Sequence, residues 1–155
     1  HRSGSMNSYT VHHREEPWTG LRETTNKIVV HTRNKQDVST PRALDAYFRR
    51  RGFLCCGYHY VLTASGVHVM RHPESIGAAH ADHDQTAVYI AILNFDGKTM
   101  PVPKQLEGPL VSLLHDLSTR YPAAEILSAP SLLGLEGYDL FTRYIEARND
   151  ARHRK

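Results

Sequence analysis

The sequence predicts a single α/β (α+β) domain in which a mixed central β-sheet is flanked by helices. Short apolar segments rich in β-branched residues alternate with helical patterns in the order β-α-β-β-β-α-β-α. The length of 155 residues suits one hydrophobic core. With 40% hydrophobic and 23% charged residues, the composition is typical of a globular protein and not of a disordered or fibrous one.

The first predicted strand is KIVVHT, residues 27–32, which is short, apolar and β-branched and carries His31 near its end. A helix is predicted from Pro41 to Arg51. Thr40 is a suitable N-cap, proline fits the first helical position, and Gly52 ends the helix.

The segment GYHYVLTASGVHVM, residues 57–70, predicts a hairpin that turns at ASG. Period-2 alternation would place Tyr58, Tyr60 and Leu62 on one face of its first strand and His59 on the other. The segment TAVYIAILNF, residues 86–95, is apolar enough for a central strand that is covered on both faces.

Leucines recur at intervals of three and four residues from Leu106 to Leu117 and predict a long helix that Pro122 stops. A short strand, AEIL at residues 124–127, and a last helix at about residues 138–149 complete the predicted chain.

The domain organisation is expected to be simple. Residues 1–5 resemble an expression-tag remnant, residues 6–20 a flexible N-terminal arm, and residues 150–155 a basic tail, so the folded domain spans 21–149. The arm contains Trp18 among charged residues, which would suit an interface with a protein partner.

The charge pattern restricts the classes of partner. A net charge of +3 and the absence of a nucleic-acid-binding motif argue against nucleic acid, and no apolar run reaches the length of a membrane span. Without an apolar signal segment, a cytoplasmic location is expected. Adjacent Cys55 and Cys56 are poorly placed to pair with each other and predict two buried thiols.

Five segments, KIVVHT, RRRGF, GYHYVLTASG, IGAAH and LLHDLSTRYP, together resemble the zinc N-acetylmuramoyl-L-alanine amidases, a family shared with peptidoglycan recognition proteins. The stretch LRETTNKIVVHT is most similar to the lysozymes of short-tailed phages, which are amidases. The resemblance covers roughly residues 21–148 and implies an amidase-like fold and a peptidoglycan-binding cleft.

The resemblance also implies roles for three residues. His31 falls on the first zinc-ligand position, Tyr58 on the tyrosine that helps hold the attacked carbonyl or the water, and His80 on a histidine bordering the cleft. A catalytic zinc site takes three protein ligands and leaves one position for water.

The other two ligand positions of the family lie after the strand at 124–127. The second holds Ala129 or Pro130, neither of which can bind a metal. The third falls near Leu135 or Tyr138, and Asp139 is the only conventional ligand close by.

The family's catalytic lysine position falls within residues 133–136, and no lysine is present there. No cofactor is therefore expected, and His31 and Tyr58 would be vestigial. A degenerate zinc site predicts a catalytically inactive relative, a pseudoenzyme that binds peptidoglycan fragments or a protein partner.

Two alternatives remain open at this point. The chain could regulate a phage RNA polymerase or bind a virion protein, because the resembled phage lysozymes also bind their phage polymerase. It could also be an active endolysin-type amidase with an altered zinc site, if the loop histidines His72, His80 and His83, with Asp82 or Asp84, supplied ligands.

Overall fold

The computed structural model describes residues 20–153. These residues form one five-stranded sheet in the order β3-β2-β4-β1-β5 with helices on both faces. The predicted tag remnant, residues 1–5, and residues 6–19 of the predicted arm lie outside the described part. The predicted single domain with a mixed sheet between helices is confirmed.

The elements follow one another along the chain as β1 (Lys27–Arg33), the 3-10 helix η2 (Gln36–Val38), α1 (Pro41–Arg50), β2 (Tyr60–Thr63), β3 (Gly66–Val69), β4 (Ala87–Leu93), α2 (Lys104–Arg120), β5 (Glu125–Ser128), α3 (Ala129–Leu132) and α4 (Leu140–Arg152). Helix α4 thus includes the first three residues of the segment predicted as a basic tail.

The sheet is mixed because only β3 runs against its neighbour. Strand β1 lies between β4 and β5 and is parallel to both, β2 is parallel to β4, and β3 is antiparallel to β2. All seven residues of β4 are buried, as expected for a parallel strand covered on both faces. The carboxyl ends of the four parallel strands therefore meet at one edge, where side chains become available for binding.

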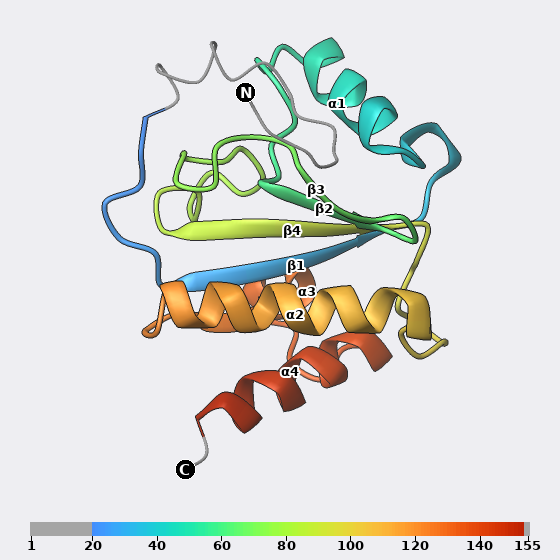
Figure 1. Cartoon of the computed structure of the whole chain (residues 1–155), viewed down its shortest axis with the longest axis vertical. Coiled ribbons are helices and arrows are strands. Elements are labelled where there is room, and N and C mark those ends of the chain that lie inside the picture. The colour runs from blue at the N-terminus through green and yellow to red at the C-terminus, as the bar shows by residue number, and fades with distance from the viewer. Residues whose placement is uncertain (1–19, 154–155) are drawn as a thin grey trace.

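Each face of the sheet has its own hydrophobic core (Figure 1). Helices α2 and α4 cover one face through the α2 leucines and Phe141 and Ile145 of α4. Helix α1 covers the other face through Leu44 and Phe48, and Thr40 caps it by accepting a hydrogen bond from the Ala43 amide. The predicted cleft residues lie on the α1 side.

The face assignment of Tyr58 in the predicted hairpin was wrong. Strand β2 begins only at Tyr60, so the alternation does not extend back to Tyr58. Tyr60 and Leu62 pack in the α2 core, whereas Tyr58 packs in the α1 core with Val61. This change of face brings Tyr58 to the side of the sheet that carries His31.

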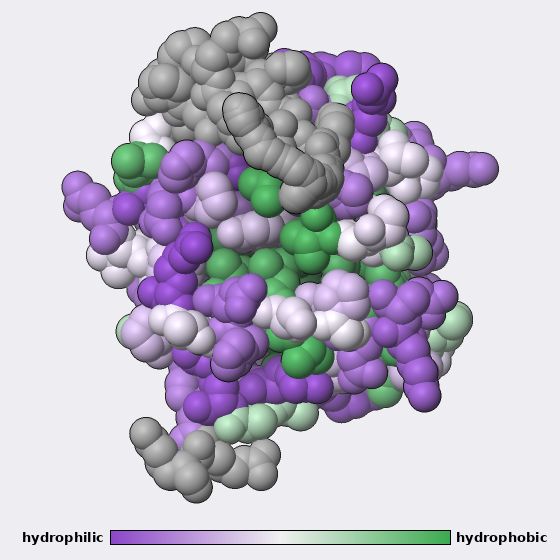
Figure 2. Space-filling view, in the orientation of Figure 1, coloured by the Kyte–Doolittle hydropathy of each residue, from purple (hydrophilic) through white to green (hydrophobic). Residues whose placement is uncertain are grey.

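The surface in Figure 2 is mostly polar, with apolar side chains gathered across the middle of the view above helix α2. Among residues 20–153, no helix is both long and apolar enough to cross a membrane. Cys55 and Cys56 are both buried, as predicted.

Candidate functional site

Two histidines far apart in the sequence meet at the carboxyl edge of the sheet. His31 lies in β1, and His80 lies in the loop before β4. Their Nε2 atoms are 3.2 Å apart and their rings stack with centroids 5.0 Å apart. Burial lowers the pKa of His31 to about 3, helped by His80 and Arg33, and burial also lowers the pKa of His80. Both imidazoles are therefore neutral at pH 7, and one ring donates its N–H to the other.

Aromatic rings surround this imidazole pair. The ring centroid of Tyr58 lies 4.8 Å from that of His31, so the structure brings together the three predicted cleft residues His31, Tyr58 and His80. Tyr89 of β4 lies 5.9 Å from both histidine rings. The sequence prediction missed Tyr89 because its strand appears uniformly apolar. In the sheet, Ala91 pairs with His31, and alternation along β4 puts Tyr89, two residues earlier, on the same face.

The loop that carries His80 is fixed by one carboxylate. Asp84 Oδ1 accepts hydrogen bonds from the amides of Ala79 and His80, at 3.1 and 2.9 Å, and from the Tyr89 hydroxyl at 2.7 Å. Burial, followed by this contact with Asp84, raises the pKa of Tyr89. Asp84 thus fixes the backbone that carries the His80 imidazole. Its Oδ1 atom is already used for these hydrogen bonds within the loop and with Tyr89.

The other candidate ligands of the loop have different surroundings. His83 lies beside His80 with ring centroids 6.5 Å apart, Asp82 is exposed, and His72 Nδ1 accepts a hydrogen bond from the Glu74 amide. Only His80 of these residues contacts His31 among the described contacts.

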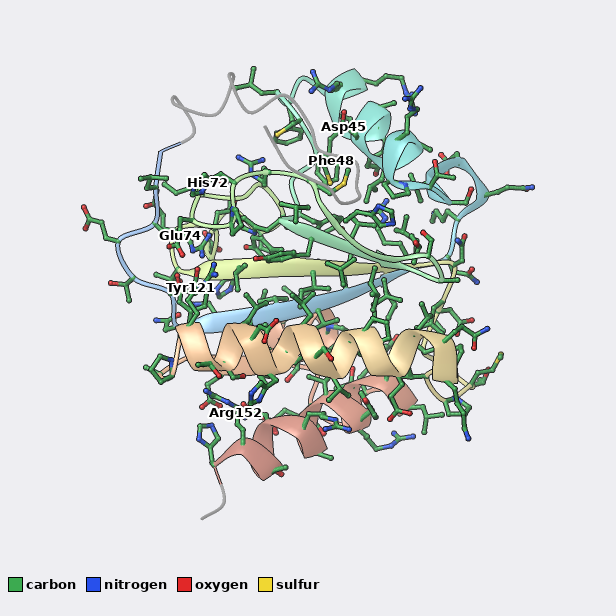
Figure 3. All side chains as sticks on the ribbon, viewed as in Figure 1. Asp45, Phe48, His72, Glu74, Tyr121 and Arg152 are labelled. Carbon is green, nitrogen blue, oxygen red and sulfur yellow. The ribbon has the colours of Figure 1, made fainter. Side chains whose placement is uncertain are left out.

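A second network ties the start of this loop to helix α2 (Figure 3). The buried Arg22 donates to the Ser75 carbonyl at 2.6 Å and to the Tyr121 hydroxyl at 3.1 Å. The Tyr121 hydroxyl donates in turn to Glu74 Oε2 at 2.5 Å, and Figure 3 shows these two side chains near each other at the end of α2. The loop that precedes His80 is thereby held to the C-terminal end of α2.

His59 is part of the same anchor. Its Nδ1 accepts a hydrogen bond from the Tyr89 amide, so its Nε2 carries the hydrogen and donates to the Ser75 carbonyl at 2.7 Å. The side chain is fully buried and both ring nitrogens are used. His59 therefore stabilises the sheet and its loop and lies outside the cleft.

The register of the sheet shows which residue follows the last β5 partner of β1. Val30, the residue before His31, pairs with Ser128 at the end of β5, and Ala129 follows as the first residue of α3. Of the two candidates for the second ligand position, the register favours Ala129 over Pro130. The neighbouring Leu132 packs against the α1 core, so this side of His31 is apolar.

The described residues do not fit a catalytic zinc site. No group of three His, Cys, Asp or Glu side chains is arranged to hold a metal ion anywhere in residues 20–153. Asp139 is the N-cap of α4, where its Oδ1 accepts a hydrogen bond from the Thr142 amide at 2.8 Å. The side chains next to His31 are one further imidazole and two tyrosines, so His31 and His80 are the only two of the His, Cys, Asp or Glu type among these neighbours, and catalytic zinc takes three.

The neutral, half-buried His31 makes stability depend on pH. Its pKa in the folded chain, about 3, lies below the ordinary 6.5, so between these values the unfolded chain binds a proton that the folded chain does not. Stability is thus expected to fall as pH falls through this window, by up to about 1.4 kcal/mol per pH unit from His31. Burial also lowers the pKa of His59, so His59 likewise contributes to the loss of stability as pH falls.

The check is urea denaturation of the wild type and of His31→Asn at pH 7 and pH 5. The variant is expected to lose on the order of 1–2 kcal/mol less stability between the two values. His115→Asn, at an exposed position of α2, is the matched control and should behave as the wild type. Equal losses of unfolding free energy between pH 7 and pH 5 in all three proteins would contradict the neutral state of His31 in the folded chain.

Comparison with solved structures finds the same fold in amidases, a phage endolysin and a peptidoglycan recognition protein. The endolysin and N-acetylmuramoyl-L-alanine amidase LysCS from Clostridium intestinale URNW has a TM-score of 0.71 at 19% identity, over 91% of this chain and 93% of that one. The Ph2119 endolysin of a Thermus scotoductus bacteriophage has a TM-score of 0.63 at 23% identity, over 74% of this chain and 78% of that one.

Drosophila PGRP-LB, a peptidoglycan recognition protein, has a TM-score of 0.59 at 17% identity, over 71% of this chain and 72% of that one. No protein-family model and no curated protein matches the sequence. The chain therefore has the fold that N-acetylmuramoyl-L-alanine amidases and peptidoglycan recognition proteins share, as the resemblance in its sequence predicted.

Proposed function

We propose that this chain binds peptidoglycan fragments in the cleft formed by His31, Tyr58 and His80 and does not hydrolyse them by zinc chemistry. The observation that carries the proposal is the pairing of His31 with a single imidazole, together with the apolar Ala129 directly after the end of β5. The fold is one whose solved examples include both amidases and recognition proteins.

The chemistry of the cleft suits a neutral peptide amide. Two uncharged imidazoles provide hydrogen-bond donors and acceptors, and the rings of Tyr58 and Tyr89 provide apolar surface next to them. Sites for small ligands commonly combine such apolar walls with a few fixed polar groups. A bound zinc would polarise a carbonyl or acidify a water, but the donors beside His31 do not form the set that would retain it.

The test is titration of 15N-labelled protein with a soluble muropeptide, followed by NMR. Shifts are expected at residues around His31 and His80, and His80→Ala should weaken binding by about tenfold, the effect of losing one or two hydrogen bonds. His115→Ala, on the opposite face of the sheet, is the control and should bind normally. No perturbation in the cleft would refute the proposal.

Hydrolysis is measured separately, as turbidity loss of cell-wall suspensions with and without added zinc. No loss is expected under either condition. Zinc-dependent clearing by the wild type would instead support the active amidase with an altered metal site. The remaining alternative, a protein partner such as an RNA polymerase, stays a prediction with no structural observation behind it.

A further inference from the structure

Next to the imidazole pair lies a positively charged side chain that the sequence analysis did not single out. Arg33 ends β1 two residues after His31, so both side chains project from the same face of the strand. Tyr58 contacts both: its ring packs on His31, and its hydroxyl accepts a hydrogen bond from Arg33 Nη1 at 3.0 Å.

Aromatic contacts hold the guanidinium of Arg33 in place. It lies 4.9 Å from the ring centroid of Tyr47 in α1, and Arg51 lies 3.6 Å from the same centroid. Burial alone would lower the pKa of Arg33, but Tyr58 and Tyr47 raise it. The charge is therefore permanent, and its position is set by two tyrosines from separate parts of the fold.

No carboxylate in residues 20–153 forms an ion pair with Arg33. Asp45 of α1 binds Arg49 and the Cys56 amide, and Asp84 is engaged with the His80 loop. The hydrogen bond with Arg33 lowers the pKa of the Tyr47 hydroxyl, and nearby Asp37 opposes this effect. Within residues 20–153, the charge of Arg33 therefore lies beside His31 without a carboxylate in an ion pair.

We propose that Arg33 is the anion subsite of this cleft and binds a carboxylate of the peptide ligand while the neighbouring amide lies against His31 and His80. This inference rests on the proposed function and names its ligand class, a peptide with an acidic residue. One of the five guanidinium donors is used by Tyr58, and the planar group can present others as a fork to a carboxylate.

The distance between His31 and Arg33 along β1 defines which carboxylate of a bound peptide can reach the guanidinium. Residues two apart on a strand are separated by roughly 7 Å. The subsite therefore selects a carboxylate about two residues along an extended peptide from the amide that contacts the imidazoles. The tyrosines hold the guanidinium before the ligand arrives, which reduces the entropy lost on binding.

The experiment is isothermal titration calorimetry of the full chain with three ligands: N-acetylmuramoyl-L-alanyl-D-glutamate, its diamide, and the free dipeptide L-alanyl-D-glutamate. The proteins are the wild type, Arg33→Gln and the control Arg50→Gln, which removes an exposed charge from the same helix as Tyr47. Far-ultraviolet circular dichroism checks that each variant is folded.

The expected result is that the wild type binds the acid at least tenfold more tightly than the diamide, and that Arg33→Gln abolishes this preference while Arg50→Gln keeps it. Equal binding of acid and diamide by the wild type and Arg33→Gln overturns the anion subsite and leaves the proposed function standing. Arg33-dependent binding of the free dipeptide, with no binding of either muramoyl ligand, supports the subsite and restricts the proposed function to the stem peptide without its sugar. No binding of any ligand overturns both.

Discussion

Gly57→Ala is expected to destabilise the protein by about 3 kcal/mol or more, because the added methyl group has no room. A Cβ at this position would overlap the Ala78 carbonyl oxygen and lie 2.7 Å from the Phe48 ring of α1. The Gly57 carbonyl also accepts the Ala78 amide at 3.0 Å, so the two segments cannot separate without losing this bond. Urea denaturation measures the loss.

The effect should extend to the cleft, because Ala78 precedes His80 by two residues. A displaced loop would separate His80 from His31, so the folded fraction of the variant is also expected to bind muropeptide more weakly. Gly52→Ala is the control: it has open space around it but a φ of +93°. It should lose only about 1–2 kcal/mol, from backbone strain. Equal losses in the two variants would contradict steric overlap at Gly57.

The main elements of the fold could be predicted because their patterns are local. Thr40 and Pro41 mark the start of α1, and the leucine spacing identifies α2. Helix α3 was missed because it has only four residues, too few for a helical period. Its start was nevertheless encoded, since Ser128 caps it by accepting the Ser131 amide and a proline follows within its first turn.

The site was only partly predictable for a different reason. His31 and His80 are 49 residues apart, and no periodicity relates them, so their proximity followed only from the family resemblance. Arg33 was not identified because its significance depends on Tyr47 and Tyr58, which come from a helix and a loop. Contacts between separate elements depend on tertiary packing, which a single sequence does not display.

Ala129→His is expected to create a zinc site and raise zinc affinity by at least about a hundredfold. The His31 and His80 Nε2 atoms are 3.2 Å apart, close to the roughly 3.3 Å that separates two nitrogens on a tetrahedral zinc. Ala129 directly follows Ser128, the β5 partner of Val30, and Val30 precedes His31 in β1, so we expect a new imidazole at residue 129 to supply the third ligand. Zinc at 100 times its Kd should then stabilise the variant by about 2.7 kcal/mol.

Competition with a chromophoric chelator measures the affinity, and thermal denaturation with and without zinc measures the stabilisation. Ala123→His, at an exposed position before β5, is the matched control and should bind zinc no better than the wild type. Adding His80→Ala to Ala129→His should remove the gain, because only two imidazoles would remain. Tight zinc binding by the wild type would mean that His31 and other side chains already form a complete set of zinc ligands. That result would contradict the proposal that this chain lacks zinc chemistry. A gain confined to Ala129→His would instead trace that loss to one missing side chain at the first residue of α3.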